Sequence, residues 1–398
     1  MSMLLRVTAI FDDEYWARAA EVERSLRQRT PVHRTVTPDG IPVWVITRYA
    51  DVRAALTDPR LSKDGDGLRA CVLDHHPEAE LSGLFDRHML NCDPPDHTRL
   101  RRLLARDFTP RRVAGLRPRL AELVDELLAA LPTGTPVDLV ERFAYPLPIT
   151  VICELMGIPE ADRAPFREWT TALMDRPGPG ATADASQRMA RYFTDLAEAK
   201  RREPADDLLS ALVHADGERL TRDELIATAF LLIVAGHDTT VNLVGNGARH
   251  LLADPRGWRA LAADPRLAPR AVEELLRFAG PLRTATHRFT TEPVPVGEVT
   301  IPAGEVVLVG LASANRDAAR FAEPDALDLT RDASGHVAFG HGVHHCLGAP
   351  LARLEAELAF TELPRRFPRA RLAADPAELR HRTSTLISGH PELPVVLG

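Results

Sequence analysis

The 398-residue chain has few cysteines and almost no lysine. Its four cysteines, Cys71, Cys92, Cys153 and Cys346, are widely scattered, which argues against a disulfide framework. Only two of the 49 basic residues are lysines, and the net charge is −7. This balance excludes a nucleic-acid-binding surface as the main feature and indicates an arginine-favouring, GC-rich genome.

The sequence also lacks an uninterrupted apolar run of about 18 residues and the charged-then-apolar start of a secretory signal. We therefore expect a cytoplasmic protein with no membrane segment. No internal repeat or low-complexity stretch appears, and none of the Pro- and Gly-rich breaks is typical of a linker. We expect one domain over residues 1–398, with a large core because 45% of residues are hydrophobic.

Hydrophobic periodicity predicts a mainly α protein with small β-sheets. Residues 58–92 are polar and weakly periodic, and we expect a long functional loop there. The expected helices are 12–29, 48–57, 93–104, 113–131, 145–157, 162–175, 184–203, 221–253, 267–278 and 347–367. The expected strands are 31–37, 41–47, 282–289, 294–301 and 305–311, followed by a β-like tail at 381–397.

One stretch combines glycines, histidines and a cysteine: Phe339-Gly340-His341-Gly342-Val343-His344-His345-Cys346-Leu347-Gly348. A helical pattern follows it, so Cys346 stands at a helix mouth, where a thiolate is favoured as a metal ligand or nucleophile. A buried structural cysteine beside surface histidines is the simpler alternative, but it leaves both glycines and Phe339 unexplained. A zinc site built from His341, His344, His345 and Cys346 is a third possibility, although residues so closely spaced rarely complete a tetrahedron.

The longest helical pattern, 221–253, begins with a capping box at Thr221 and Glu224. Its apolar run Leu225–Gly236 predicts a helix through the middle of the molecule, one too short to span a bilayer. Poor helix formers interrupt that run in Ala235-Gly236-His237-Asp238-Thr239-Thr240. Such a break favours a functional site, with a capped kink as the alternative.

Two further patterns carry charge. Eight arginines lie between Arg99 and Arg119 against one acid, Asp107; this is either a solvated basic face or a docking surface for an anionic partner. His97 and Arg101 are four residues apart and share a helical face. Glu274 and Arg277 are three apart, a local pair usually worth only tenths of a kcal/mol.

Together, these patterns resemble the bacterial cytochrome P450 family of haem-thiolate monooxygenases. The family's cysteine loop, Phe-Gly-x-Gly-x-His-x-Cys-x-Gly, is matched from Phe339 to Gly348, and its Ala-Gly-x-Asp/Glu-Thr-Thr is matched from Ala235 to Thr240. Its Glu-x-x-Arg and His-x-x-x-Arg are matched by the two pairs above. The resemblance runs from about residue 10 to the end. It implies a single-domain α+β cytochrome P450 fold, with haem b between the central helix and the cysteine-loop helix.

The resemblance also implies roles for individual residues. Cys346 would be the axial ligand of the haem iron, with Phe339, Gly340 and Gly348 shaping its loop. The propionate donors would be His97, Arg101, Arg288 and His344, with Arg283 as the competitor of Arg288. Ala235 and Gly236 would leave room for O₂, the co-substrate, and Asp238 and Thr239 would serve as catalytic residues that supply protons. Glu274 and Arg277 become a structural pair, and His237 stays away from the iron.

The implied activity is hydroxylation or epoxidation of a mostly apolar small molecule, as in actinobacterial tailoring of polyketide and macrolide secondary metabolites such as antibiotics. Electrons would pass from NAD(P)H through a ferredoxin reductase and a separate ferredoxin to a monomeric enzyme. Non-hydroxylating oxidation (C–C coupling or dehydration) and a haem-free binding domain remain alternatives. The expected substrate contacts are Leu81, Met89, Leu90, Leu173, Met174, Leu282, Leu386 and Ile387. The expected ferredoxin-docking residues are Arg99, Arg102, Arg106, Arg111 and Arg112.

Overall fold

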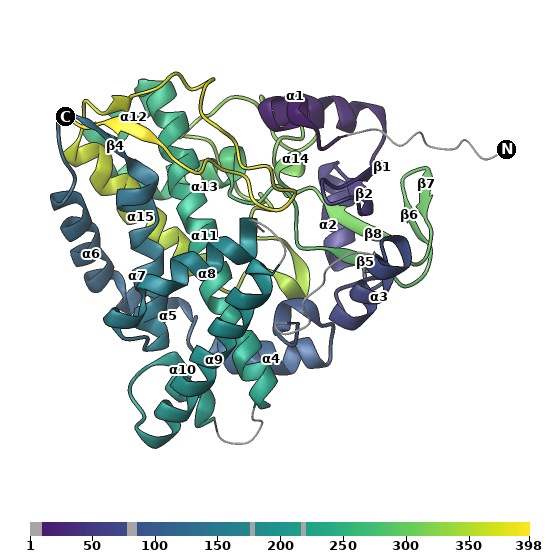
Figure 1. The fold of residues 1–398 in the computed structure, drawn as a ribbon. Helices are drawn as coiled ribbons and strands as arrows, with labels where there is room; N and C mark the ends of the chain where they lie inside the picture. Colours follow the sequence, from purple (N-terminus) through teal and green to yellow (C-terminus); the bar gives the residue numbers. More distant parts are fainter. Residues whose placement is uncertain (1–9, 78–85, 176–179, 216–219) are drawn as a thin grey trace.

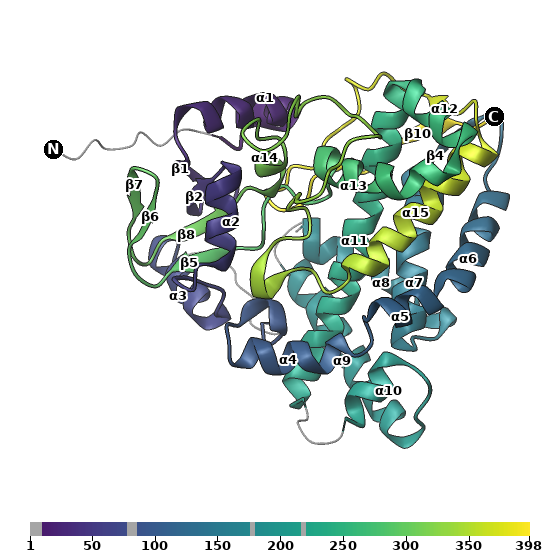
Figure 2. The ribbon, with the colours of Figure 1, turned by 180° about the vertical axis from the view of Figure 1, so that it is seen from behind.

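A long central helix runs through the molecule, with most other helices on one side of it and most of the strands on the other (Figures 1 and 2). This computed structural model describes residues 10–77, 86–175, 180–215 and 220–398. The long helices of this part are α1 (Asp13–Arg29), α3 (Gly65–His75), α4 (Asp96–Ala105), α6 (Arg117–Ala129), α7 (Pro146–Met156), α8 (Ala164–Asp175), α9 (Ala181–Arg202), α11 (Arg222–Ala253), α13 (Ala268–Ala279) and α15 (Ala349–Arg366).

Shorter helices connect these elements: α2 (Tyr49–Thr57), α5 (Pro110–Gly115), α10 (Leu208–Val213), α12 (Pro255–Ala263) and α14 (Leu311–Asn315). Single turns lie at η1 (Met89–Asn91), η2 (Val140–Ala144), η3 (Glu160–Asp162), η4 (Pro265–Leu267) and η5 (Gly342–His344). The strands are β1 (Val32–Val36), β2 (Pro42–Ile46), β3 (Leu61–Ser62), β4 (Pro136–Asp138), β5 (Arg288–Thr290), β6 (Val294–Val296), β7 (Val299–Ile301), β8 (Val306–Val309), β9 (Arg371–Leu372) and β10 (Pro394–Val396).

The largest sheet has the strand order β1-β2-β8-β5-β3. The hairpin expected from 31–37 and 41–47 is confirmed as β1 and β2, which pair antiparallel with Val32 opposite Ile46. β2 then pairs parallel with β8, which joins the beginning of the chain to a strand far along the sequence. β5 lies next to β8 and therefore brings Arg288 into this sheet.

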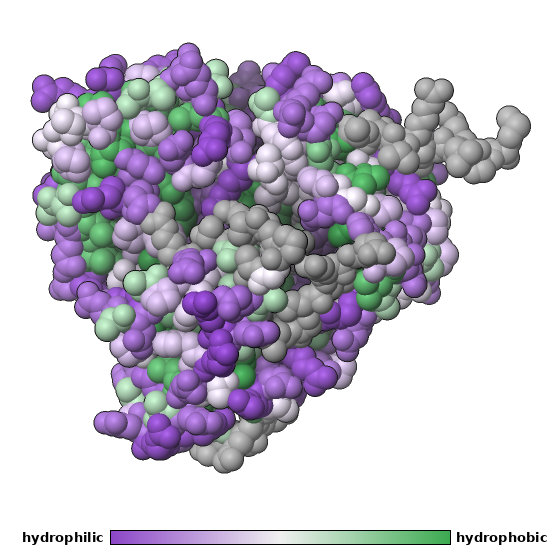
Figure 3. Space-filling model, viewed as in Figure 1, coloured by the Kyte–Doolittle hydropathy of each residue, from purple (hydrophilic) through white to green (hydrophobic). Residues whose placement is uncertain are grey.

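The central helix α11 is confirmed, including its capping box: Glu224 N donates to Thr221 Oγ1 at 3.2 Å, and Thr221 N donates to Glu224 Oε2 at 2.8 Å. By length and composition α11 could cross a membrane, so the expectation that its apolar stretch is too short was wrong. However, 67% of its most apolar window is buried inside the fold, against helices such as α7 and α15. On the face shown in Figure 3, apolar residues form scattered patches among hydrophilic ones. α11 is therefore a core helix.

Four expectations about the strands and loops were wrong. Residues 58–92 include the helix α3, which Asp64 caps through Gly67 N. Residues 294–301 are two strands, because Gly297 adopts a left-handed turn with φ of 58°. In 282–289 only the end enters β5, and in the tail only β10 is a regular strand. Between these two segments there is one isolated bridge, Leu282 with Ile387, flanked by the backbone bonds from Arg283 N to Leu386 O and from Ser388 N to Pro281 O.

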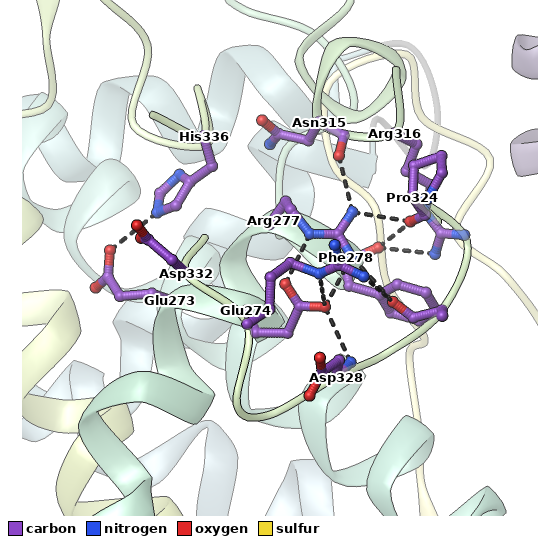
Figure 4. Close-up of polar contacts among 12 residues, drawn as sticks. Glu273, Glu274, Arg277, Phe278, Asn315, Arg316, Pro324, Asp328, Asp332 and His336 are labelled. Atoms are coloured by element: carbon purple, nitrogen blue, oxygen red, sulfur yellow. Dashed lines mark hydrogen bonds and ion pairs between the residues drawn. The ribbon is translucent and has the colours of Figure 1, made fainter. Parts of the chain in front are cut away.

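Glu274 and Arg277 of α13 form an ion pair with fully buried side chains (Figure 4). Arg277 donates to both carboxylate oxygens at 2.7 Å, and its remaining N–H groups reach the carbonyls of Asn315, Pro324 and Ala326. Glu274 also accepts from the Asp328 N–H and from Arg331. The small stabilisation expected for a local helical pair does not apply here. All five guanidinium N–H groups are bonded inside the protein, and the pair ties α13 to residues 315–331.

We predict that Arg277→Met lowers the free energy of unfolding by about 3–5 kcal/mol, because it leaves the Glu274 carboxylate buried without its main partner. Urea denaturation followed by far-UV circular dichroism measures the change. The control is Arg266→Met at an exposed pair with Asp264, with the arginine side chain 90% exposed, where we expect no measurable change in the free energy of unfolding. Equal effects of the two substitutions would contradict this prediction.

Candidate functional site

The cysteine loop is a tight turn closed by its own backbone. Cys346 N donates to the Phe339 carbonyl at 2.9 Å, and Gly340 N donates to Val337 O at 2.9 Å. Gly340 and Gly342 have φ of 71° and 75°, a region that side-chain-bearing residues rarely adopt. A Cβ on Gly342 would also lie 2.9 Å from Thr57 Cγ2, at the end of α2. Both glycines are therefore required, the second by packing against α2 as well.

Cys346 lies just before α15 and is exposed in this structure. The surrounding protein raises the pKa of its thiol through desolvation, whereas the Gly348 N–H, the charge of Arg101 and the Ala349 N–H act in the opposite direction. The expected placement at a helix mouth is therefore correct: first-turn amide groups of α15 point at the sulfur. A Cβ on Gly348 would lie 3.9 Å from that sulfur, at ordinary van der Waals distance.

The buried pair of α13 extends to the cysteine loop. Arg277 binds the Asn315 carbonyl at 3.0 Å (Figure 4). The side chain of Asn315 accepts from the N–H of Val337, two residues before the loop, at 2.7 Å. Asn315 of α14 thus links α13 to the cysteine loop through hydrogen bonds.

The neighbouring residue Glu273 makes a second brace. It accepts from His336 at 3.1 Å and from Arg353 of α15 at 2.6 Å. Arg353 in turn lies over the ring of Phe339, 4.6 Å from its centre. Burial alone would raise the pKa of Glu273, but the hydrogen bonds from His336 and Arg353 hold it at about 2. Both sides of the loop are therefore fixed to α13.

Positively charged and imidazole groups gather beside the loop. The rings of His97 and His344 lie 4.4 Å apart, although one is on α4 and the other in η5. Burial, followed by the charges of Lys63, His97, Arg288 and Arg101, lowers the pKa of His344 to about 2. Within the described part of the chain, both ring nitrogens of His97, Nε2 of His344 and Nε of Arg288 are buried without a hydrogen-bond partner. Such donors call for an anionic ligand.

Lys63 belongs to this group, and the sequence analysis missed it. Its side chain is buried, its ammonium group donates to Thr286 Oγ1, and burial together with the charge of Arg288 lowers its pKa to about 7. The sequence contained one signal: Lys63 is one of only two lysines in an arginine-rich chain. The other, Lys200, is ion-paired to Asp207, so both lysines occupy specific positions.

The structure separates Arg288 from its competitor Arg283. Arg288 donates to the Leu61 carbonyl at 3.0 Å and lies in the cluster. Arg283 instead lies over the rings of Tyr15 and Trp16, with Nη1 3.8 Å from Glu23. Arg283 therefore anchors α1.

Two other arginines have partners that the sequence did not indicate. Arg101 uses one nitrogen to donate to the His345 carbonyl at 2.7 Å, so it also holds the loop. Arg99 is half-buried and binds Glu224, the capping residue of α11. Arg102, Arg106, Arg111 and Arg112, the other expected docking residues, are exposed.

On the central helix, Ala235 is exposed although most of the residues around it are buried. Thr239 lies one turn further on the same face, and its hydroxyl donates to the Ala235 carbonyl at 3.0 Å. A Cβ on Gly236 would lie 3.0 Å from Ile152 Cγ1, so the packing of α7 leaves little room for a side chain here, a constraint that the sequence did not show. His237 is buried and bonds to the Ile233 carbonyl, away from Ala235.

The expected substrate contacts are spread over several elements. Met89, Leu90, Leu282 and Leu386 are half-buried, whereas Ile387 is buried. Leu173 is buried within the main hydrophobic core, which makes it a packing residue in this structure. Leu81 lies outside the described residues, as does the side chain of Met174.

These features fit the haem that the sequence resemblance implies. A thiol faces first-turn amides of α15, exposed Ala235 lies on a helix that packs against α15, and unpartnered buried donors suit propionate groups. Zinc ligation finds no support: among the described residues, no group of three or more His, Cys, Asp or Glu side chains could hold a metal ion.

Comparison with known proteins gives concordant matches. The family model described as Cytochrome P450 matches residues 265–387. Cytochrome P450 107B1 of Saccharopolyspora erythraea is 50% identical over 97% of this chain and 96% of its own length. The Vitamin D(3) 25-hydroxylase of Pseudonocardia autotrophica is 48% identical over 98% of this chain and 96% of its own length. The tirandamycin C-bound structure of the P450 monooxygenase TamI has 48% identity and a TM-score of 0.93, covering 98% of this chain and 100% of that chain.

We predict that Arg288→Gln increases the rate of haem transfer to apomyoglobin by about tenfold, because a charged hydrogen bond contributes roughly 1.5–3 kcal/mol. Arg283→Gln is the matched control from the same segment. It removes a buried arginine that contacts α1, so we expect a lower melting temperature but haem loss within about twofold of native. Faster haem loss from the Arg283 variant than from the Arg288 variant would reverse the assignment.

Proposed function

Because this chain belongs to the cytochrome P450 family and is a haem-dependent monooxygenase, we propose that it hydroxylates or epoxidises a polyketide- or macrolide-type secondary metabolite. The proposal treats residues 1–398 as one domain. The observation that carries it is the convergence of three features: Cys346 at the mouth of α15, the unpartnered donors beside it, and exposed Ala235 on α11.

Cys346 would ligate the haem iron, a role that its contacts with the N–H groups of Gly348 and Ala349 support. When bound, the haem supplies the iron at which O₂ is reduced with two electrons and two protons and one oxygen atom is transferred to substrate. His97, Arg288, His344 and the newly found Lys63 would bind the propionates. Arg101 would share this role while also holding the loop.

Thr239 and Asp238 would handle protons. The Thr239 hydroxyl lies on the helical face of Ala235 and can donate a hydrogen bond away from the Ala235 carbonyl when an oxygen acceptor is present. Asp238 is buried and ion-paired with Arg382. A carboxylate one residue from a hydroxyl can exchange protons between the solvent side and that hydroxyl, which is the task of a relay.

The substrate would contact Met89, Leu90, Leu282, Leu386 and Ile387, which favour a mostly apolar molecule. Support for a polyketide-type compound comes from relatives that hydroxylate or epoxidise macrolide and polyketide substrates and from the neighbour bound to tirandamycin C. The similarity to a vitamin D(3) 25-hydroxylase makes a secosteroid the alternative to test.

Electrons would come from NAD(P)H through a ferredoxin reductase and a ferredoxin. Exposed Arg102, Arg106, Arg111 and Arg112 on α4, α5 and the turn between them give this face positive charge. We propose that an acidic ferredoxin docks there and that the enzyme acts as a cytoplasmic monomer.

The function is tested with a panel of macrolides, linear polyketides and secosteroids. We expect a macrolide or polyketide to shift the Soret band toward high spin and to be converted to a product with one added oxygen atom, detected by mass spectrometry. A response to secosteroids alone would overturn the substrate assignment. A reduced carbonyl complex without the red-shifted Soret band of thiolate ligation would overturn the assignment of Cys346.

The matched pair Thr239→Ala and Thr228→Ala tests the mechanism within the same turnover assay. A positioned proton donor contributes at least about 10²-fold to a proton transfer, so we expect Thr239→Ala to lower product per NAD(P)H by about tenfold and to release hydrogen peroxide instead. Thr228, buried on the same helix, should leave that ratio unchanged.

We predict that the double substitution Arg106→Glu/Arg111→Glu slows reduction by an acidic ferredoxin about tenfold at low salt, because charge steering accelerates encounter. Raising the ionic strength should slow the native protein and narrow this difference. Arg256→Glu is the control, since this 87% exposed arginine lies on α12, away from α4 and α5 in Figures 1 and 2. A flat salt response would argue against the docking surface.

A further inference from the structure

Buried polar side chains follow one face of the second half of α11. Asp238, Asn242 and Asn246 are four residues apart and therefore share a face. They are 8%, 3% and 6% exposed, within a helix whose other buried residues are mostly apolar. Buried polar groups require partners, and neighbouring turns of the helix supply only some of them.

One further partner is the Ala279 carbonyl at the end of α13, which accepts from Asn246 at 3.2 Å. The others come from one segment of the C-terminal tail, residues 382–389. Arg382 Nη1 lies 3.1 Å from both carboxylate oxygens of Asp238. Asn246 donates to the Ser388 carbonyl at 2.8 Å. Asn242 leaves no room for a side chain at Gly389, where a Cβ would lie 1.8 Å from Asn242 Oδ1. The polar face of α11 is therefore a seat for this tail segment.

The segment is a closed loop. Arg382 N donates to the Gly389 carbonyl at 2.9 Å, joining its two ends. It contains no regular strand, since β10 begins only at Pro394. Its geometry therefore depends on the contacts at its two sides.

Its other side binds the segment 281–284. Arg283 N donates to the Leu386 carbonyl and Ser388 N donates to the Pro281 carbonyl, both at 2.8 Å, and Thr284 Oγ1 donates to the Thr385 carbonyl at 2.9 Å. The loop thus lies between α11 and the chain around Leu282. Leu386 and Ile387, two of the proposed substrate contacts, are at its centre.

We propose that Asp238 and Arg382 act as one positioning pair that seats the loop 382–389, so that the proposed proton-relay acid also determines how tightly substrate is bound. Arg382 provides the charged link between the loop and the polar face of α11, alongside the Asn246 bond. Its side chain is 24% exposed and that of Asp238 is 11% exposed, so solvent screens this pair only partly. Removing either charge frees the same end of the loop and displaces Leu386 and Ile387.

This inference rests on the proposed function in one respect, namely that the loop lines the substrate site. The seating itself does not depend on the substrate. Hydrogen exchange of the loop amides measures it in the substrate-free holoenzyme, and substrate affinity is then a second, separate readout. If no compound of the substrate panel binds, hydrogen exchange of the loop alone still tests whether the pair holds the loop in place.

Hydrogen–deuterium exchange with mass spectrometry is measured on peptides covering 382–389 in native holoenzyme and in Arg382→Gln, Asp238→Asn and the double variant. We expect about tenfold faster exchange in each single variant and no further increase in the double variant, because both substitutions break the same contact. The dissociation constant from the Soret shift should rise about tenfold in parallel.

The control is Arg380→Gln, two residues away. The Arg380 side chain is 77% exposed, and its nearest approach to Glu392, 4.0 Å, is too long for a strong ion pair. Loop exchange and substrate affinity of this variant should stay within about twofold of native. Arg382→Lys guards against a variant that simply misfolds. A single nitrogen of Arg382 bonds to both carboxylate oxygens of Asp238, so the ammonium group of a lysine can take its place. Hydrogen exchange of the loop in Arg382→Lys should therefore stay within about threefold of native.

The proposal is overturned if Asp238→Asn reduces turnover while loop exchange and affinity stay at native values, because Asp238 would then act in proton transfer alone. Additive effects of the two single substitutions, or loss of protection in Arg382→Lys equal to that in Arg382→Gln, would overturn it as well.

Discussion

The buried ion pair of Glu274 and Arg277 is the constraint on which the arrangement of the site depends. Every donor of the guanidinium is used, partly by the carbonyls of an irregular segment that has little secondary structure of its own. Through Asn315 the pair also fixes the first residues of the cysteine loop. Because an unpaired charge in this place would be costly, the pair specifies one arrangement of chain segments far apart in the sequence. The loop that carries Cys346 is thus positioned by α13, a helix that does not contain this cysteine.

The cluster beside the cysteine shows the opposite situation. Buried His97, Arg288 and Lys63 lie close to half-buried His344, and several of their polar nitrogens have no partner within the described protein. Such a cluster lowers the stability of the chain by itself, and an anionic cofactor relieves it. Burial and the neighbouring positive charges also lower the pKa values of His344 and Lys63, so that both side chains lose their protons more readily. Stability and cofactor binding are therefore linked in this fold.

The central helix combines three tasks along its length. Its first half is apolar and packs in the core, its middle exposes Ala235 beside Thr239, and its second half presents Asp238, Asn242 and Asn246 to the C-terminal tail. A helical repeat of about four residues allows neighbouring positions to face different partners. The proposed contacts with substrate and the proposed supply of protons would therefore be linked through this one helix.

The sequence by itself determined the mainly helical fold, the capping box at Thr221, the turn around Cys346 and the four motifs, because each depends on neighbouring residues and short-range periodicity. It also identified Arg288, but without a reason to prefer it to Arg283; the choice required β5 beside β8 and the rings of Tyr15 and Trp16 over Arg283. The helix α3, the hairpin at Gly297 and the irregular tail were missed, since weak local preferences were decided by contacts with distant segments. Only the tertiary structure brought Lys63 to His344 and Arg382 to Asp238. Charges distant in sequence interact through space, and their burial sets the strength of that interaction.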